Sequence, residues 1–374
     1  MHRSSSGATL PQPASVATAA PGGALWAIVF AGGIGSRFWP LSSPERPKAV
    51  LNLLSDHPLI ADTIRRLEPV IPVERTLVLV ARDIAPAVRA AIPDVPTDNV
   101  LIEPRPLGTA AALAWGLEVI RRRGGANDIV CAVHVDLAVG FPHAFRTALQ
   151  RAASLALRHG VLVELGVSPT RPETAFGYAV PGERIEPPSP SDGIAASRVM
   201  RFVEKPSLDV VAELLTDGAL WHAGIVVGQV QHMTDELFVN APELAAGRDA
   251  LLRGNMPAFA AQVRSVSVER ALLERTTSLA VLPIECAWDD VGTWAALRRA
   301  RDLDDDGNGA IGNVRFVDSE SNVVHAEGAT IVLFGCEQLL VVTLPGLTFV
   351  TTLERAAELR PLLDALPKRL TQSG

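Results

Sequence analysis

ALWAIVF over residues 24–30, followed directly by AGGIGSRFWPL over residues 31–41, is the stretch that decides the fold of this chain. The first run is apolar and uninterrupted, which predicts a buried β-strand. The second run begins with glycines, which can adopt positive φ and let another molecule approach the backbone. Successive N–H groups in such a turn can converge on an anion. The sequence therefore predicts a strand followed by an anion-binding turn.

Two basic side chains accompany this turn. Arg37 offers a fixed fork of donors that suits phosphate oxygens, and Lys48 adds a mobile charge shortly downstream. The dinucleotide fingerprint would need a small residue where Phe38 stands, and the Walker loop would need Gly-Lys-Ser/Thr. A plain glycine-rich turn remains the alternative. We interpret the stretch as a site for the polyphosphate of a nucleotide, with backbone contacts at Ala31, Gly32, Gly33 and Gly35.

The composition limits the classes of protein to which the chain can belong. Its 374 residues carry a net charge of −7, and an acidic chain is a poor candidate for nonspecific nucleic-acid binding. Three cysteines without a C-x-x-C pair argue against a disulfide framework or a zinc site, so we expect a cytoplasmic protein. No apolar run reaches the ~20 residues of a membrane span. Residues 1–23 are rich in Ser, Ala, Pro and Gly and are expected to form a disordered tail.

Apolar runs alternate with helical patterns in the first half of the chain. We expect strands at 24–30, 76–81, 99–104, 128–136 and 161–167, and helices at 57–70, 84–92, 109–122 and 142–158. This alternation predicts an α/β fold with a doubly wound, mostly parallel sheet that binds ligands at the carboxyl ends of its strands. An acidic break follows at 302–309. It divides a domain at 24–302 from a small domain at 308–374. The small domain contains short β-type runs, which we interpret as coils of a stacked β-helix, and a closing helix at 353–366.

Two acidic residues are candidate metal ligands. Asp136 ends an apolar strand, and Asp290 lies in a turn rich in Trp and Gly. Two carboxylates beside a triphosphate would bind Mg²⁺, which uses few protein ligands together with phosphate oxygens. The alternatives are a helix N-cap for Asp136 and a turn residue for Asp290, and Asp289 competes for the metal role.

Residues 32–48 match the motif G-G-x-G-x-R-[LF]-x-P-L…P-K of the sugar-nucleotide pyrophosphorylases. With Trp39 before Pro40, the chain most resembles the mannose-1-phosphate guanylyltransferase branch of that family. The resemblance covers residues 24–366. It implies a Rossmann-like nucleotidyltransferase domain, a short C-terminal left-handed β-helix and no appended isomerase domain. It also implies transfer of a guanylyl group from GTP to mannose 1-phosphate, which gives GDP-mannose and pyrophosphate.

The resemblance assigns a sugar-phosphate pocket to the middle of the chain. Lys205, in the segment F-V-E-K-P, would hold the phosphate of the sugar 1-phosphate, and Glu204 would reach the sugar hydroxyls. Gly177 is expected in the same pocket. His222 stands where the family motif W-N-[SA]-G has Asn, so the chain departs from the family at the sugar.

Other segments resemble the family around the nucleotide. Glu103 and Thr109 fit the pattern E-P-x-x-x-x-T, near the base and ribose. Thr109 is equally a good N-cap for the helix that follows. The segment Ser267–Glu274 resembles a family helix that we interpret as structural support.

The expected reaction is mainly a matter of positioning and charge neutralisation. Its catalytic residues would be Arg37, Lys48 and Lys205. Within the class, another nucleotide or sugar is the first alternative. A catalytically weak paralogue that binds a nucleotide-sugar as a regulator is the second, and a glycosyltransferase is the third, although no D-x-D motif is obvious. A homodimer is a further expectation, in which the apolar C-terminal strands would pair between two subunits.

Overall fold

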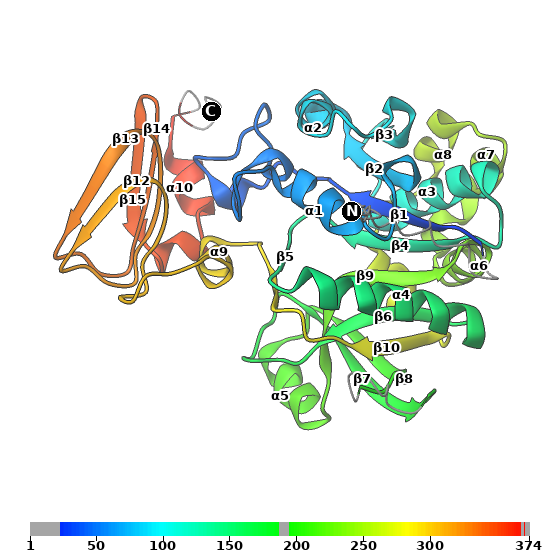
Figure 1. Ribbon diagram of the computed structural model, residues 1–374. Coiled ribbons are helices and arrows are strands. Elements are labelled where there is room, and N and C mark those ends of the chain that lie inside the picture. Colours follow the sequence, from blue (N-terminus) through cyan, green and yellow to red (C-terminus); the bar gives the residue numbers. More distant parts are fainter. Residues whose placement is uncertain (1–22, 187–193, 368–369, 371–374) are drawn as a thin grey trace, which may run out of the picture.

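The computed structural model describes residues 23–186, 194–367 and 370 (Figure 1). The tail expected at 1–23 lies outside the described residues, except for Gly23. The described part forms a large sheet covered by helices and, beside it, a small sheet of C-terminal strands. No helix within it is long and apolar enough to cross a membrane.

The large sheet has nine strands in the order β3-β2-β1-β4-β9-β6-β10-β8-β7. Their bounds are β1 Leu25–Phe30, β2 Thr76–Ala81, β3 Val100–Glu103, β4 Ile129–His134, β6 Leu162–Val167, β7 Gly177–Arg184, β8 Ser197–Glu204, β9 Leu220–Gln229 and β10 Leu279–Pro283. The five strands expected in the first half are confirmed, with ends within two residues of the expected bounds.

The sheet is mixed rather than mostly parallel. Strands β3, β2, β1 and β4 run parallel to one another, and β6 and β10 also form a parallel pair. Strand β9 inserts between β4 and β6 and is antiparallel to both, and β8 is antiparallel to β10 and β7. The expectation of a mostly parallel sheet is therefore wrong for the second half. A strand buried on both faces is apolar throughout, so its composition does not show its direction.

Helices cover both faces of the sheet (Figure 1). They are α1 Leu59–Leu67, α2 Ala85–Ala91, α3 Thr109–Arg123, α4 Pro142–His159, α5 Leu208–Thr216, α6 Val230–Asn240, α7 Arg248–Leu252, α8 Met256–Gln262, α9 Trp294–Ala300 and α10 Arg360–Ala365. Alternate residues of β1 belong to two cores, Ala27 and Val29 with α1, α2 and α4, and Trp26 and Ile28 with α3, α6 and α8. This two-sided burial explains the uninterrupted apolar run of β1.

A separate ribbon of two antiparallel strands lies beyond the carboxyl end of β4. It consists of β5 Leu137–Val139 and β11 Trp288–Asp290, with Leu137 opposite Asp290. The N–H of Val291 donates to the carbonyl oxygen of Asp136 over 2.8 Å. The ribbon therefore brings the residue just after β4 beside the segment that precedes α9.

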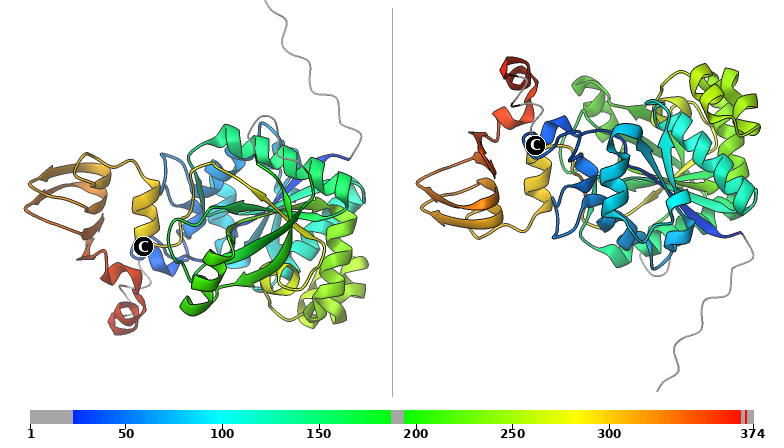
Figure 2. Two further views of the ribbon diagram at one scale, coloured as in Figure 1. Left: turned by 90° about the horizontal axis from the view of Figure 1, so that it is seen from below. Right: turned by 90° about the horizontal axis from the view of Figure 1, so that it is seen from above.

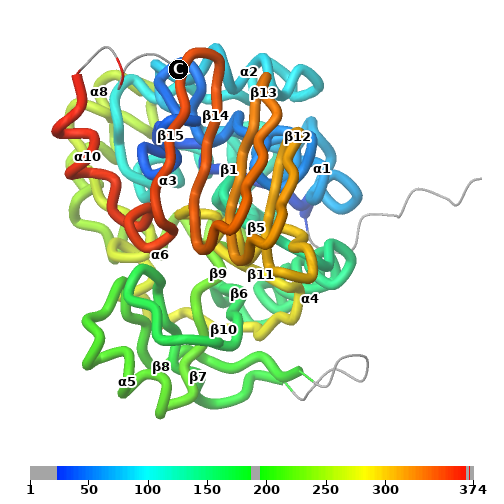
Figure 3. The backbone as a smooth tube through the Cα atoms, turned by 90° about the vertical axis from the view of Figure 1, so that its left-hand side faces the viewer, coloured from blue at the N-terminus to red at the C-terminus, as the bar shows by residue number. Residues whose placement is uncertain are grey.

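The C-terminal strands form a sheet of four, visible side by side in Figure 3. They are β12 Gly309–Val317, β13 Val323–Phe334, β14 Leu339–Leu344 and β15 Leu347–Thr352. Strands β12, β13 and β14 are parallel, and β15 returns antiparallel to β14. The short β-type runs at 322–326 and 330–335, expected as separate strands, are joined in β13. The closing helix expected at 353–366 is reduced to α10 with a short turn before it. The β-helix, the domain boundary and the homodimer stay predictions.

This C-terminal sheet packs on the segment that follows the glycine turn. The rings of Trp39 and Phe349 lie 5.1 Å apart, and Trp39 Nε1 donates to the carbonyl oxygen of Leu370 over 3.3 Å. The guanidinium of Arg46 binds both carboxylate oxygens of Glu327 at 2.9 and 2.6 Å. Figure 2 shows α9 between the small sheet and the main body. The two parts thus meet next to the turn that the sequence marks as functional.

Candidate functional site

The backbone of the turn after β1 packs against the side chain of Lys48. Gly33 and Gly35 have φ angles of 90° and 79°, which favour glycine. A Cβ on Gly35 would lie 2.4 Å from the Cβ of Lys48, so no other residue fits there without a shift. The N–H of Lys48 also donates to the carbonyl oxygen of Ile34 over 2.9 Å. The residues from the turn to Lys48 therefore form a compact, closed loop.

A cavity of about 490 Å³ lies beside this loop. Phe30, Leu79 and Ile84 provide apolar walls. Among the residues expected to bind the nucleotide, those that line this cavity are Gly32, Gly33, Gly35, Glu103 and Thr109. Ala31 is fully buried and packs in the core instead. The volume and the mixture of apolar walls and a few polar groups are typical of a small-molecule site.

Glu103 and Thr109 have defined partners at this cavity. The carboxylate of Glu103 accepts a hydrogen bond from the N–H of Leu107 over 2.9 Å, and burial raises its pKa. Helix α3 begins at Thr109 with Gly108 at the N-cap, and the hydroxyl of Thr109 accepts from the N–H of Val268 over 2.9 Å. The N-cap alternative for Thr109 is therefore wrong.

A second cavity of about 340 Å³ adjoins the first, and Thr109 lines both. It brings together side chains from distant parts of the chain. The expected site residues in its lining are Arg37, Thr109, Asp136, Gly177, Glu204, Lys205, His222 and Asp290. The structure therefore brings these predicted residues together around one cavity.

The two candidate metal ligands lie in this second cavity, with Lys48 beside them. The ammonium of Lys48 lies 2.7 Å from a carboxylate oxygen of Asp136. Burial opposes ionisation of Asp136, but Lys48 and His134 outweigh it and hold the pKa of Asp136 below its usual value. Burial and the neighbouring Asp136 carboxylate raise the pKa of Asp290 to about 6. The Asp136 carboxylate raises the proton affinity of Asp290, and a divalent cation beside the pair would offset this repulsion.

The carboxylate pair fits Mg²⁺ better than a metal held by protein alone. Within residues 23–186, 194–367 and 370, no three His, Cys, Asp or Glu side chains converge as a metal cage. Mg²⁺ commonly takes one or two carboxylates and completes its shell with phosphate and water. Asp289, the competing candidate, is bound by Arg299 at 2.7 and 3.1 Å and does not line the cavity.

Strands β7 and β8 supply one wall of the second cavity. Gly177 pairs with Glu204 across these strands, and a Cβ on Gly177 would lie 2.9 Å from a carboxylate oxygen of Glu204. Lys205 follows at the end of β8 with a φ of 52°, and its ammonium donates to Glu204 over 2.8 Å. The Lys205 side chain is 57% exposed, so it is free to turn toward a bound anion.

His222 lies 8% exposed in β9, at the bottom of the same cavity. Its Nδ1 lies 2.7 Å from a carboxylate oxygen of Glu164, which is fully buried in β6. Burial disfavours the imidazolium, but Glu164 outweighs burial and raises the pKa of His222. Burial likewise raises the pKa of Glu164. The pair therefore retains a proton between Nδ1 and the carboxylate.

Two acidic residues of the site were missed in the sequence. Glu164 interrupts the apolar run VLVELGV, and a charge at the centre of a buried strand is a signal that a partner lies opposite. Glu269 lies in a π-helical turn within Ser267–Glu274, the segment interpreted as structural support, and lines the cavity 3.6 Å from His134. Burial opposes ionisation of Glu269, but His134 outweighs burial and lowers the pKa of Glu269 to about 2.

Comparisons with known proteins agree with this arrangement. The family model described as nucleotidyl transferase matches residues 26–307. A mannose-1-phosphate guanylyltransferase of Sinorhizobium fredii is 30% identical over 90% of this chain and 67% of its own length. One from Salmonella typhimurium is 31% identical over 85% and 68%. A crystal structure from Thermus thermophilus, described as a mannose-1-phosphate geranyltransferase, matches with a TM-score of 0.79 and 30% identity over 91% of this chain and 98% of that one.

Proposed function

Because the chain belongs to the nucleotidyl transferase family, we propose that it transfers a guanylyl group from GTP to mannose 1-phosphate, giving GDP-mannose and pyrophosphate. The observation that carries this proposal is the pair of adjoining cavities that share Thr109. The first would hold the base and ribose, and the second the sugar phosphate. Lys48 and the carboxylates of Asp136 and Asp290 would lie near the triphosphate. The relatives' names favour neither the regulatory paralogue nor another substrate pair.

The reaction needs no covalent intermediate on the protein. A phosphate oxygen of the sugar 1-phosphate would form a bond to the α-phosphorus of GTP, and the bond from that phosphorus to the bridging oxygen of the β-phosphate would break. Arg37 and the loop N–H groups would stabilise the leaving pyrophosphate, and Lys205 would orient the attacking phosphate. Bound to Asp136 and Asp290, Mg²⁺ would neutralise charge on the phosphates.

The proposal is tested by pyrophosphate release over a grid of nucleoside triphosphates and sugar 1-phosphates. We expect the highest kcat/KM for GTP with mannose 1-phosphate. A higher kcat/KM for another pair would assign that pair as the substrates of the same type of reaction. No release with any pair would overturn the proposed activity.

We also propose that the C-terminal strands form a short β-helix. Strand β12 has nine residues, which extended would span ~30 Å, while residues 318–322 can bridge only ~18 Å before β13. Because Gly309 pairs with Val323, the chain must return to the start of β12 within that connection. It can do so only if β12 bends, and the register of β12 shifts at Gly312, which has a φ of 92°. Bent parallel strands of this kind are typical of a solenoid coil.

Lys205→Ala is expected to raise KM for sugar 1-phosphate about 10- to 100-fold and to change KM for the nucleotide by less than about threefold. The reason is the loss of one charge-assisted hydrogen bond to the sugar phosphate, worth ~1.5–3 kcal/mol. Steady-state kinetics with each substrate varied in turn checks it. Equal effects on both substrates would contradict the assignment of Lys205 to the sugar phosphate.

His222→Asn is expected to raise kcat/KM for mannose 1-phosphate relative to glucose 1-phosphate about tenfold. An amide and an imidazole satisfy different pairs of sugar hydroxyls, and an unpaired buried group costs ~1–3 kcal/mol. Since Glu164 raises the pKa of His222, KM for the sugar should change with pH above 6.5 in the wild type and become flat in the variant.

Glu164→Gln is the matched control for this variant. It keeps the imidazole and removes the charge that raises its pKa, so the pH dependence should move to lower pH. The raised pKa also means that the pair stabilises the fold fully below pH 6.5 and loses this contribution as pH rises through the folded pKa of His222. Thermal denaturation over pH separates this effect from sugar binding. An unchanged sugar ratio together with an unchanged pH profile in His222→Asn would assign His222 to packing.

A further inference from the structure

A third cavity, of about 590 Å³, lies beside the β5–β11 ribbon and shares no lining residue with the proposed sugar site. Ala138 and Val139 of β5 line it, whereas Leu137 lines the sugar cavity. It is larger than either substrate cavity and within the range of small-molecule sites. None of the residues expected to bind substrate lines it.

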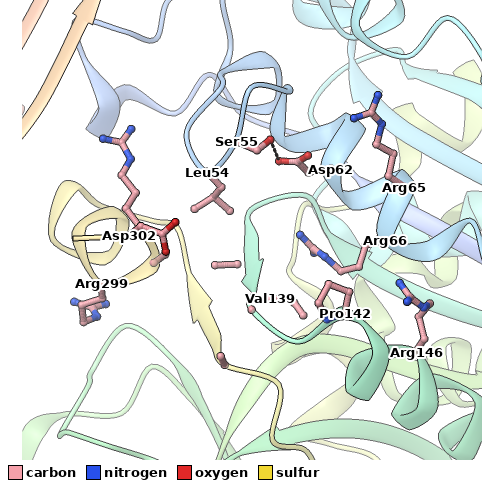
Figure 4. A pocket seen from close by; sticks show the side chains of 15 residues that line it. Leu54, Ser55, Asp62, Arg65, Arg66, Val139, Pro142, Arg146, Arg299 and Asp302 are labelled. Carbon is pink, nitrogen blue, oxygen red and sulfur yellow. Dashed lines mark hydrogen bonds between the residues drawn. The ribbon is translucent and has the colours of Figure 1, made fainter. Parts of the chain in front are cut away.

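Basic side chains dominate this cavity (Figure 4). Figure 4 shows Arg66 and Arg146 on one side of the space and Arg299 and Asp302 on the other. The arginines in the lining are Arg65, Arg66, Arg146, Arg299 and Arg301, and the acids are Asp62 and Asp302. The cavity therefore carries an excess of positive charge in a chain whose net charge is −7.

Arg66 is the most buried of the arginines that line this cavity. It is 9% exposed, and its Nη1 is fully buried without a hydrogen-bond partner in the described residues. The nearest carboxylate that influences it, Asp62, accepts a hydrogen bond from Ser55 over 2.8 Å. The guanidinium contacts the ring of Phe145, with 5.9 Å from its carbon to the ring centroid. Burial outweighs the attraction of Asp62 and lowers the pKa of Arg66.

Arg301, which also lines the cavity, likewise has nitrogens that no described residue binds. Its Nε donates to the carbonyl oxygen of Leu53 over 2.9 Å, while both Nη atoms are buried without a partner among the described residues. Buried charged groups in proteins are normally paired and hydrogen-bonded. Two arginines of this cavity therefore carry guanidinium nitrogens that no described residue satisfies, and such a lining favours an anion.

We propose that this cavity binds a phosphate-bearing small molecule, at a site separate from the substrates. The planar fork of a guanidinium matches the oxygens of a phosphate, and several forks around one space favour a dianion over a single carboxylate. The remaining volume would hold the organic part of a phosphate monoester. Arg299, on the far wall, also binds Asp289, the neighbour of the candidate metal ligand Asp290. A ligand that binds Arg299 would therefore compete with Asp289 for this guanidinium. Asp289 is adjacent in the chain to Asp290, one of the two candidate metal ligands.

The test measures the binding of inorganic phosphate and of glucose 6-phosphate by calorimetry and by the shift in Tm at constant ionic strength. The protein variants are Arg66→Met, which removes the buried charge but keeps the stem, and Arg89→Met, the same change at an exposed position of α2 outside the cavity. Lys205→Ala separates this site from the proposed sugar-phosphate site. We expect Arg66→Met to weaken binding at least about tenfold and Arg89→Met and Lys205→Ala to change it by less than about threefold.

Stability provides an independent readout. Because an unpaired buried charge destabilises a protein, Arg66→Met should match or exceed the wild-type Tm without phosphate and should lose the shift on its addition. Binding that Lys205→Ala abolishes and Arg66→Met leaves intact would overturn the proposal, since the anion would then occupy the substrate cavity. If glucose 6-phosphate binds more tightly than phosphate, the natural ligand is a monoester; equal affinity assigns the site to inorganic phosphate.

Discussion

Asp136→Asn and Asp290→Asn are each expected to lower kcat/KM about 10³-fold. Each variant removes one of the two carboxylates that would hold Mg²⁺, and a bound metal contributes several kcal/mol of charge stabilisation, at ~1.4 kcal/mol for each tenfold in rate. Pyrophosphate release measured against Mg²⁺ concentration checks this result. Activity should vanish with EDTA and return with Mg²⁺ or Mn²⁺, and each variant should need more metal than the wild type.

Asp289→Asn is the matched control, because Asp289 adjoins Asp290 but is bound by Arg299 at 2.7 Å. We expect its kcat/KM to stay within about threefold of the wild type. If instead Asp289→Asn raises the metal requirement and Asp290→Asn does not, the metal role passes to Asp289.

The same carboxylates predict a pH dependence of metal binding. The pKa of Asp290 is raised to about 6 by burial and by Asp136, so the free site gains a proton as pH falls through this value. Metal must then displace that proton, and apparent affinity should fall by about tenfold for each pH unit below about 6. Mg²⁺ titrations between pH 5 and 8 check it, and an affinity independent of pH would contradict Asp290 as a ligand.

Arg37→Ala is expected to lower kcat about 10²-fold or more, the usual effect of losing one preorganised donor to a transition state. Arg37 is exposed and lines the second cavity, so its loss should not disturb the fold. Arg37→Lys keeps the charge without the fork and should give an intermediate rate. Arg89→Ala serves as a surface control. Activity of Arg37→Ala within threefold of the wild type would exclude a catalytic role.

Much of the site could be predicted because its residues lie at the ends of strands. Arg37 follows β1 and Asp136 follows β4, and these two strands are neighbours and parallel. Carboxyl ends of parallel neighbours meet at one edge of a sheet, so local patterns were enough to gather these residues. The contact of Lys48 with Asp136 crosses 88 residues and depends on how the loop folds beneath the glycines, which no local pattern specifies.

What could not be predicted depends on strand direction and on buried charge. Strand β9 places His222 opposite Gly166 only because it is antiparallel to β6, and an apolar strand gives no sign of its direction. The partnership of His222 with Glu164 follows from that register. Glu269 escaped notice because its turn has the apolar pattern of a supporting helix, while one acidic side chain points to the cavity.

The contacts of Trp39 and Arg46 with the C-terminal strands have a consequence for the order in which the protein is made. The glycine turn is synthesised before Phe349 and Glu327, on which its flanking segment packs, and Glu327 lies 281 residues after its partner Arg46. A nascent chain can therefore form its central strands and still lack the contacts that support the segment after the glycine turn. Slow synthesis of the C-terminal strands would leave this segment unsupported while the central sheet is already folded.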